Sequence, residues 1–438
     1  MKAAMILAGA CAALLAAEAA AQTPSAAPAP AAAPPPAPAK RAGPPPPPPP
    51  PPGWPFPGQP VEYLPKSARG QAQTPAFPEQ TRAPYTPSKV RFQVNTVADG
   101  LEYPWGLAFL PDGRMLVTER PGRIRIVSGH TLSPPIAGLP EVHTQAISGM
   151  LDVVIDPHFV SNHMIYWTYV EARDTGSGVT LAKGRLVDGP APRVEDVKVI
   201  YRQKPDLVTT HSNYGGRLVF GRDGLLYVTL GDRDEMQWRP LIQRLDTGVG
   251  KVIRIDTNGA SPKDNPFVGQ AGALPELWAL GFRNPIGMSW RPGTHELWVA
   301  DVGPRGGDEI DIVKPGANYG WPVIGYGQEY SGDRVGEGTA KDGMEQPAYY
   351  WDPVISPSSV MFYDGKLFPA WRGSAFVTSL TQQHLVRLAM KGDKAVGEER
   401  LLADLKERLR EVKQGPDGSL YILTDNAKGR ILQLTPGG

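Results

Sequence analysis

A glycine-rich stretch, residues 300–322, carries the acidic side chains of this chain that could best hold a metal ion. It follows the apolar run 297–300, and we expect it to be a loop after a strand. Its carboxylates are Asp301, Asp308, Glu309 and Asp311. Calcium binds carboxylate and carbonyl oxygens, and glycine turns carbonyls inward at little steric cost. The spacing is not that of an EF-hand loop, so the stretch is a candidate calcium site, with a solvated acidic turn as the alternative.

Arginine residues in two other segments could bind an anionic ligand. Arg283 and Asn284 precede a proline just after the apolar run 277–280, and Arg408 and Arg410 alternate in one predicted strand, so that their side chains would share a face. A guanidinium group binds a carboxylate through two parallel hydrogen bonds. These positions form a candidate anion site, and the alternative is a set of surface salt bridges.

The elements that must position these residues are short strands. Apolar or alternating runs recur from residue 90 onward, between turn signals, and long helical periodicity is absent. The predicted strands lie at 115–117, 124–127, 153–155, 165–169, 225–230, 252–255, 297–300, 375–379 and 420–423. Turns at Pro111–Gly113, Arg222–Gly224 and Pro416–Gly418 each precede a strand, and Arg291–Gly293 is a looser copy. Such recurrence over about 345 residues favours an all-β propeller rather than a sandwich.

The first 89 residues are of a different kind. Residues 1–21 have the form of a secretory signal peptide, which predicts a periplasmic or secreted protein. Cleavage there would remove Cys11, the single cysteine, and lipidation at Cys11 is the alternative. Residues 22–89 are rich in alanine and proline, with nine prolines at 44–52, and predict a disordered linker that begins to pack on the domain near residue 61. The predicted domain spans residues 90–438.

The charge of the chain excludes some partners. The formal net charge is +1 with a sequence pI near 7.8. No basic stretch with interleaved aromatic residues is present, so nucleic acid is not an expected partner. No amphipathic helix with a cationic face is found either, and we expect no membrane insertion after removal of the signal peptide.

Five blocks in a fixed order resemble a known family. They are Tyr103–Arg120, Gly215–Arg233, Ala279–Met288, Gly303–Pro322 and Arg408–Asp425. They are similar to blocks of the soluble quinoprotein sugar dehydrogenases, the glucose/sorbosone dehydrogenase family, and the similarity spans roughly residues 92–435. The resemblance implies a six-bladed β-propeller that uses calcium and pyrroloquinoline quinone (PQQ).

The resemblance also assigns ligands. Arg283, Asn284, Arg408 and Arg410 would contact PQQ, and Thr381 stands where the family has a lysine contact. The carbonyls of Gly303 and Pro304 would bind the catalytic calcium ion beside PQQ. Glu309 and Tyr319, with carbonyls near residues 324–326, would bind a second, structural ion.

The catalytic base is where the chain departs from the family. The family histidine lies four residues before the arginine that corresponds to Arg217, and here that position is Asn213. Asp232 matches the family aspartate that orients the histidine. Asparagine takes no proton at neutral pH, so either His211 replaces the base or the base is missing. Ile147 also stands where the family has a glutamine.

The resemblance therefore predicts oxidation of the C1 hydroxyl of aldose sugars to lactones, with electrons passed to an external acceptor. Two alternatives stay open. One is a catalytically degenerate propeller that binds a sugar or a protein partner, because several polar contacts differ. The other is a propeller lactonase, because calcium in a channel also serves ester chemistry.

Overall fold

Hairpins of one type connect the first and second strands of several sheets. At the first of them, Gly113 has a φ of +86°, and the Asp112 carboxylate accepts a hydrogen bond from the Arg114 backbone N–H at 3.1 Å. Glycine reaches this φ without a steric penalty, and aspartate closes the turn. The same arrangement recurs at Asp223–Gly224 and Asp417–Gly418. The repeated turn motif of the sequence therefore marks equivalent loops of different blades.

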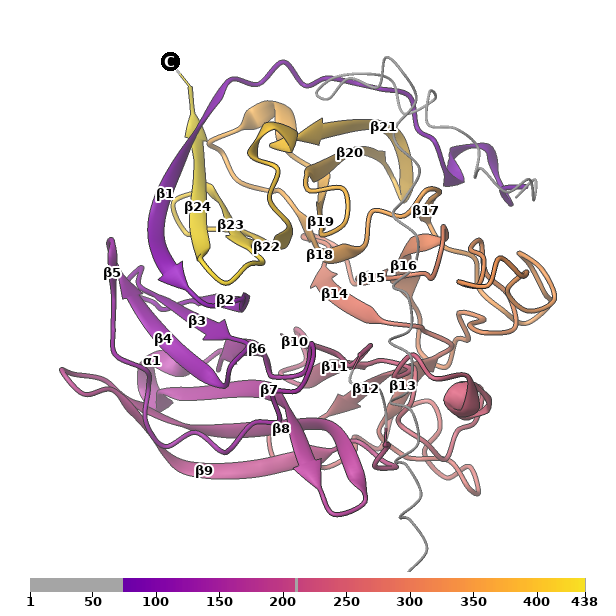
Figure 1. Ribbon diagram of the computed structural model, residues 1–438, viewed down its shortest axis with the longest axis horizontal. Helices are drawn as coiled ribbons and strands as arrows, with labels where there is room; N and C mark the ends of the chain where they lie inside the picture. The colour runs from indigo at the N-terminus through magenta and orange to yellow at the C-terminus, as the bar shows by residue number, and fades with distance from the viewer. Residues whose placement is uncertain (1–73, 209–211, 438) are drawn as a thin grey trace, which may run out of the picture. The chain divides into compact units, whose positions relative to one another are not determined.

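The computed structural model describes residues 74–208 and 212–437, which form six four-stranded antiparallel sheets (Figure 1). The first three blades are β2 (Pro104–Phe109), β3 (Met115–Glu119), β4 (Arg123–Ser128) and β5 (Thr131–Leu132); β6 (Met150–Ile155), β7 (Met164–Arg173), β8 (Gly176–Val187) and β9 (Arg193–Arg202); and β10 (Gly215–Phe220), β11 (Leu226–Leu230), β12 (Lys251–Ile255) and β13 (Leu277–Leu280). The next two are β14 (Pro285–Trp290), β15 (Leu297–Asp301), β16 (Asp308–Val313) and β17 (Tyr349–Trp351); and β18 (Pro357–Phe362), β19 (Ala375–Ser379), β20 (Leu385–Lys391) and β21 (Lys394–Leu401). The predicted six-bladed β-propeller is confirmed.

The sixth blade joins the two ends of the described chain. It comprises β22 (Leu409–Gln414), β23 (Leu420–Thr424), β24 (Gly429–Pro436) and β1 (Phe92–Leu101). Strand β1 pairs with β24 from Phe92 opposite Pro436 to Leu101 opposite Gly429. An early strand therefore completes the blade that the last three strands begin.

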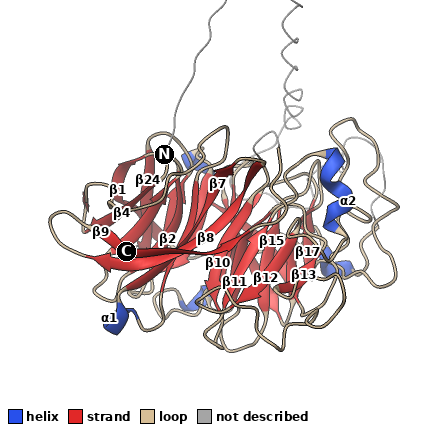
Figure 2. Ribbon diagram, turned by 90° about the horizontal axis from the view of Figure 1, so that it is seen from below, coloured by secondary structure: helices blue, strands red, loops and turns tan. Residues whose placement is uncertain are grey.

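Helices are few and short. They are α1 (Phe159–Asn162), α2 (Arg239–Ile242) and the 3₁₀ turns η2 (Pro78–Gln80), η3 (Met236–Trp238), η4 (Pro369–Trp371) and η5 (Ala403–Leu405). Loops leave the sheets at both ends of the blades (Figure 2). Within the described part of the chain, none of the helices has the length and apolar character to cross a bilayer.

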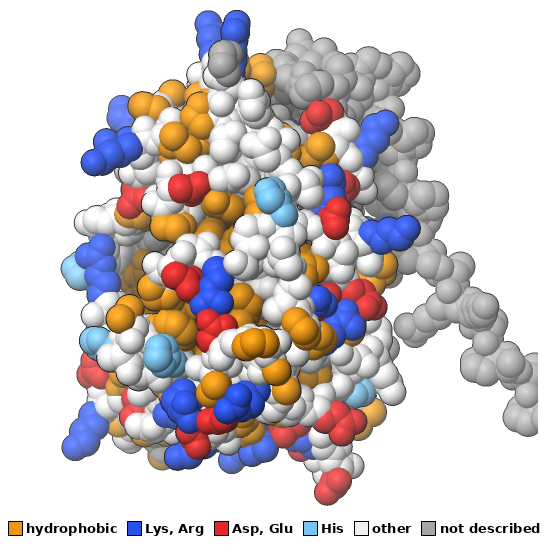
Figure 3. Space-filling view, turned by 90° about the vertical axis from the view of Figure 1, so that its left-hand side faces the viewer, with side chains coloured by type: hydrophobic (Ala, Val, Ile, Leu, Met, Phe, Trp, Pro, Cys, Tyr) orange, Lys and Arg blue, Asp and Glu red, His pale blue; other side chains and the backbone are white. Residues whose placement is uncertain are grey.

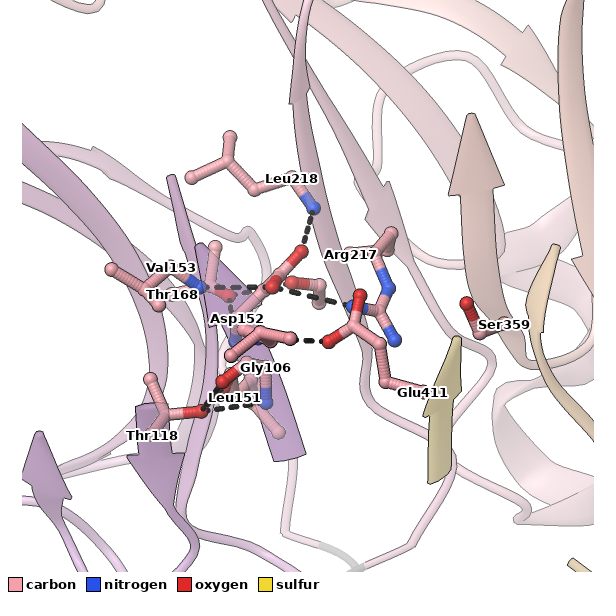
Figure 4. A network of polar contacts seen from close by, with 12 residues as sticks. Gly106, Thr118, Leu151, Asp152, Val153, Thr168, Arg217, Leu218, Ser359 and Glu411 are labelled. Carbon is pink, nitrogen blue, oxygen red and sulfur yellow. Dashed lines mark hydrogen bonds and ion pairs between the residues drawn. The ribbon is translucent and has the colours of Figure 1, made fainter. Parts of the chain in front are cut away.

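The innermost strands of the blades meet around the channel, where Arg217 of β10 is buried. Its Nη1 lies 2.8 Å from Glu411 Oε1 of β22 and 3.3 Å from Asp152 Oδ1 of β6 (Figure 4). The guanidinium group also lies 4.3 Å from the centre of the Trp105 ring. Two carboxylates and a cation therefore form a buried cluster, which we call the channel cluster.

Hydrogen bonds from the channel cluster reach the other three inner strands. Arg217 donates to the carbonyl of Ile286 in β14 at 3.0 Å and to that of Ser358 in β18 at 3.2 Å. Glu411 accepts from the backbone N–H of Leu107 in β2 at 2.9 Å. One arginine and its partners thus tie together the innermost strands of all six blades.

The outer surface carries both signs of charge. On the side shown in Figure 3, basic and acidic side chains are interspersed among apolar ones. Ion pairs join neighbouring strands, as between Arg185 of β8 and Asp196 of β9 at 3.4 Å. Exposed pairs of this kind contribute little to stability.

Several sequence predictions fall on residues that the structure does not describe, namely 1–73, 209–211 and 438. The signal peptide, Cys11, most of the linker and His211 are among them. All described residues lie in one unit of the chain, Pro50–Gly438, and the other unit, Met1–Pro49, lies wholly outside them. The domain boundaries at residues 21 and 89 stay predictions.

Candidate active site and cation cavity

A cavity of about 170 Å³ lies where the inner strands begin, at one end of the channel. We call it the arginine cavity. It is lined by Trp105, Arg120, Ile147, Leu151, Asn213, Tyr214, Gly215, Asn284, Ile286, Val302, Ser356, Leu380, Arg408 and Arg410. The cavity combines three guanidinium groups with two aromatic rings, a donor set suited to a planar anion.

Asp425 holds two of these arginines. Its Oδ2 accepts hydrogen bonds from Arg408 Nε at 3.0 Å and from Arg410 Nη2 at 2.9 Å. Burial alone would raise the pKa of Asp425, but Arg410 and Arg408 lower it below its ordinary value. Arg408 lies just before β22 and Arg410 within it, and the buried Asp425 carboxylate holds both side chains at the same cavity.

Asn213 and Asp232 are in direct contact on the cavity wall. Asn213 Nδ2 donates to Asp232 Oδ1 at 2.9 Å, and Asn213 adopts a left-handed conformation that asparagine tolerates. Asp232 also accepts from Trp321 Nε1 at 2.8 Å and from the Asp234 backbone N–H at 2.8 Å. Burial raises the pKa of Asp232, and the Arg283 guanidinium opposes this rise. The aspartate that matches the family position is therefore bonded to an amide.

Two further predicted residues lie beside the arginine cavity rather than on its wall. Arg217 lies in the channel cluster, next to Trp105, which lines the cavity. Thr381 shares a hydrogen bond with the hydroxyl of Ser356, a lining residue, and its own N–H donates to Ile355. Neither side chain is among those that line the cavity.

A second, much smaller cavity of about 20 Å³ brings together all four predicted metal ligands. We call it the cation cavity. It is lined by Arg283, Asp301, Gly303, Pro304, Gly307, Glu309, Tyr319, Trp321, Ile324, Gly325, Tyr326 and Gly327. Gly303 and Pro304 were expected at one ion and Glu309 and Tyr319 at another, but the four residues line the same cavity. The Tyr319 hydroxyl already bonds the Ile312 carbonyl and the Lys314 N–H, so only its carbonyl could serve a cation.

The acidic residues around this cavity divide into two pairs. Asp301 accepts the backbone N–H groups of Arg283 and Asn284, and Asp308 accepts those of Gly303, Ile355 and Ser356. These two carboxylates hold loops in place. Burial raises the pKa of each to about 7, against these hydrogen bonds.

The other pair is Glu309 and Asp311. They lie in strand β16, where alternation puts them on one face, and not in the expected loop. Both oxygens of Asp311 are buried without a hydrogen-bond partner among the described residues, and Glu309 beside it is half-buried. Burial, then the neighbouring carboxylates, raises the pKa of both groups well above ordinary values. A buried carboxylate without a donor, next to a second carboxylate, is the chemistry that a divalent cation satisfies.

Glycines are required where two loops of this cavity meet. A Cβ atom on Gly303 would lie 2.4 Å from the Gly307 carbonyl oxygen, and one on Gly327 would lie 2.4 Å from the Gly306 carbonyl oxygen. The two loop backbones therefore approach as closely as glycine allows, which leaves a cavity the size of an ion.

The predicted pair Arg283 and Asn284 is divided between the two cavities. Asn284 lines the arginine cavity and accepts the Gly215 N–H at 3.2 Å. Arg283 lines the cation cavity, where it pairs with Asp234 at 2.7 Å and donates to the Val302 and Gly303 carbonyls. Arg283 and Asn284 are consecutive in the chain, and each of them lines a different cavity.

The sequence analysis missed several lining residues. Trp105 stands inside a matched block, at YPWG, and Tyr214 directly before another, at SNYGG, which was the available signal. The Tyr214 ring lies 4.0 Å from the Arg233 guanidinium, which fixes it from behind. Arg120 is placed over the Tyr103 ring at 3.9 Å. Only the fold shows that these side chains converge.

The fold and the two cavities define a propeller of the sugar dehydrogenase class, and the comparison with known families agrees. The family model of Glucose / Sorbosone dehydrogenase matches residues 101–433. The chain belongs to this family, and it is an oxidoreductase that acts on the CH–OH groups of sugars.

Individual relatives are similar over most of the domain. The aldose sugar dehydrogenase YliI of Escherichia coli (strain K12) is 40% identical over 348 residues, which cover 78% of this chain and 92% of the relative. The crystal structure of a glucose dehydrogenase superposes with a TM-score of 0.76 at 45% identity, covering 79% of this chain and 99% of that chain. The PQQ-bound form of the aldose sugar dehydrogenase of Streptomyces coelicolor gives a TM-score of 0.66 at 26% identity, with coverages of 80% and 99%.

Proposed function

We propose that this protein oxidises the C1 hydroxyl of aldose sugars to lactones with PQQ and calcium, and passes the electrons to an external acceptor. The observation that supports it most is the arginine cavity, with Arg408 and Arg410 fixed by Asp425 at the channel end. The similarity to a PQQ-bound aldose sugar dehydrogenase supports the same cofactor.

The residues of the arginine cavity fit PQQ, a planar tricarboxylate. The Arg410 Nε is buried without a hydrogen-bond partner, and the Arg408 side chain is 45% exposed. Both guanidinium groups therefore keep donors for ligand carboxylates. Trp105 and Tyr214 offer apolar faces for a flat ring system, and Asn284 and Ser356, which is hydrogen-bonded to Thr381, offer neutral polar contacts.

The cation cavity fits calcium on its donor set. Glu309 on the cavity wall supplies charge, with Asp311 beside it on the same face of β16, and the carbonyls of Gly303, Pro304 and Tyr319 would supply further oxygens. The cation would neutralise carboxylates whose burial is otherwise costly. We assign one ion to this cavity, and the assignment of Gly303 and Pro304 to a separate catalytic ion stays a proposal drawn from the family resemblance.

Oxidation at C1 removes a proton from the hydroxyl oxygen and a hydride from carbon, and leaves a lactone carbonyl. When bound, PQQ supplies the two-electron acceptor, and calcium supplies a Lewis acid. This chain must hold the sugar with its C1 hydroxyl inside the cavity and take up the proton. We propose His211 as the base, since it lies two residues before Asn213 on the cavity wall.

The direct test is reconstitution of the metal-free protein with PQQ and calcium, followed by dye reduction with a panel of aldoses. We expect reduction that needs both additions and an aldose, with a lactone as product. Saturable PQQ binding without turnover of any aldose would favour the second candidate function, a propeller that binds sugar or a protein partner without catalysis. The bond of Asp232 to an amide at Asn213 is the observation that favours this candidate.

A further inference from the structure

Residues 74–91 form a segment that we call the strap, and it lies before the region that the family model matches. It passes the outer strands of two blades on its way to β1 (Figure 1). Thr81 forms a parallel bridge with Tyr350 of β17, and Tyr85 forms one with Glu398 of β21. The backbone N–H groups of Thr86 and Glu398 donate across this second junction at 3.0 and 2.9 Å. The strap is thus paired with the propeller through its backbone.

One side chain of the strap is fully buried. Gln80 has 0% exposure, and its Nε2 donates to the Pro347 carbonyl at 3.0 Å and to Gln346 Oε1 at 3.2 Å. Its Oε1 accepts the Ala76 N–H at 2.6 Å and the Tyr326 hydroxyl at 2.9 Å. A buried amide whose oxygen and nitrogen are both satisfied is a specific attachment, because any lost partner leaves an unpaired polar group.

Tyr326 carries this attachment to the cation cavity. It lines that cavity between Gly325 and Gly327, and its ring stacks on Tyr350 at a centroid distance of 3.9 Å. Burial, then the charge of the Glu309 carboxylate, raises the pKa of Tyr326 to about 12. The Tyr326 hydroxyl is therefore held by Gln80 of the strap at 2.9 Å and by Gln346 at 2.6 Å, while its backbone borders the site of the expected ion.

The glycines on either side of Tyr326 make its hydrogen bonds and ring stacking important for the order of this segment. Gly325 and Gly327 leave the backbone free to adopt many conformations, so an ion would have to order the carbonyls of this segment by itself. The hydrogen bonds and the ring stacking of Tyr326 order the segment in advance. Preorganisation of this kind raises affinity by lowering the entropy lost on binding.

We propose that the strap is part of the calcium site: Gln80 is a positioning residue that holds Tyr326 and its neighbouring carbonyls in the cation-binding arrangement. The proposal rests on the calcium binding proposed above. Coupling between two sites is reciprocal. If the docked strap strengthens calcium binding by a given factor, calcium stabilises the docked state of the strap by the same factor. The N-terminal linker would then be attached most firmly to the calcium-loaded protein.

The test compares calcium affinity by calorimetry on the metal-free full-length chain and on Gln80→Ala. We expect the variant to bind calcium roughly 5- to 150-fold more weakly, the usual range for coupled sites. Glu79→Ala is the matched control, because this neighbouring residue of the strap bonds only exposed Lys394. It should leave the affinity within about twofold. Tyr326→Phe, which keeps the ring and loses the hydroxyl, should weaken binding in the same direction.

Hydrogen–deuterium exchange of peptides covering residues 74–91 gives a readout independent of affinity. Calcium should slow exchange in the strap of the wild-type chain and of Glu79→Ala, and much less in Gln80→Ala. Equal calcium affinities for Gln80→Ala and Glu79→Ala, or calcium binding without any change in strap exchange, would overturn the coupling. Absence of calcium binding to the wild-type chain would overturn the calcium assignment itself, and the coupling with it.

Discussion

Asn213 Nδ2 donates a 2.9 Å hydrogen bond to Asp232 Oδ1 at the wall of the arginine cavity. Trp321 Nε1 occupies the other oxygen of this carboxylate at 2.8 Å and also lines the cation cavity. Asp232 therefore bonds one lining residue of each cavity, and its carboxylate orients the side chain at position 213. Whether that side chain needs to be a base is the central question about catalysis in this chain.

We predict that His211→Ala lowers turnover by about 10²- to 10⁴-fold, the usual contribution of a general base. Binding of PQQ should stay within about twofold, because the cofactor donors lie on other segments. Steady-state dye reduction and a separate PQQ titration would measure the two effects. Unchanged turnover would contradict the assignment of the base to His211.

We predict that Asn213→His places an imidazole in the position that Asp232 orients. A ring there would donate Nδ1–H to the carboxylate and present Nε2 to the arginine cavity. If His211 already serves as the base, the gain in turnover should be small, within about threefold. A gain of tenfold or more would show that the wild-type chain lacks an effective base. The pH dependence of kcat/KM should show which imidazole titrates.

We predict that Arg410→Ala weakens PQQ binding roughly 10- to 100-fold, which is the loss of one charged hydrogen-bond donor. Arg291→Ala is the matched control. Arg291 follows the far end of β14, away from the arginine cavity, and pairs with Glu296 at 3.2 Å. Titration of the metal-loaded protein with PQQ, followed by quenching of tryptophan fluorescence, would compare them. Equal affinities would contradict a role of Arg410 in cofactor binding.

The channel cluster gives a stability prediction. Arg217→Met leaves Asp152 and Glu411 buried without their cation, which costs about 3–5 kcal/mol of the free energy of unfolding. Arg244→Met removes the partner of Asp246 in an exposed pair and should leave the free energy of unfolding nearly unchanged. Urea unfolding at neutral pH would measure both. Similar losses for the two variants would show that the cluster does not hold the blades together.

His384 predicts a dependence of stability on pH. Burial, then the charge of Arg400, lowers the pKa of this imidazole to about 3, from an ordinary value of 6.5. The unfolded chain therefore binds one more proton than the folded chain between these values, and stability is lost as the pH falls below 6.5. By pH 5 the loss from this residue should be about 2 kcal/mol.

The measurement for His384 is urea unfolding of the wild-type chain and of His384→Gln at pH 7 and pH 5. The variant should lose less stability between the two values, because glutamine takes no proton. Its stability at pH 7 serves as the reference for any packing change. The same loss in both proteins would place the acid sensitivity elsewhere.

Much of the fold was predictable because its signals are local. Each turn of the Asp-Gly type needs a positive φ and a short side-chain acceptor, as at Asp112 and Gly113, and a strand follows directly. The convergence of Arg408 and Arg410 was predictable from their alternation, although β22 begins only at Leu409 and Asp425 joins the two side chains. The site depends on distant contacts, which sequence patterns do not report. Gln80 and Tyr326 lie 246 positions apart, and nothing near either residue indicates the other.

The acidic stretch shows the same limit on a smaller scale. Its composition pointed to a cation site, but composition does not say which carboxylates remain available. Asp301 and Asp308 are occupied by backbone N–H groups of other loops, whereas Asp311 has no hydrogen-bond partner. Alternation along strand β16 puts Asp308 on one face and Glu309 and Asp311 on the other. A loop was expected there, so this division could not be predicted.

The pairing of β1 with β24 sets the order of events when the chain is made. The partner of Phe92 is Pro436, so the sixth blade cannot close until almost the whole chain has left the ribosome. Contacts of such long sequence separation form slowly. Until the sixth blade closes, the unpaired strand edges of β24 and of the first blade can pair with other chains. A nascent chain of this protein would therefore depend on strand β24 to stop it from aggregating, and loss of this strand would also remove the buried side chains of Ile431, Leu432 and Leu434.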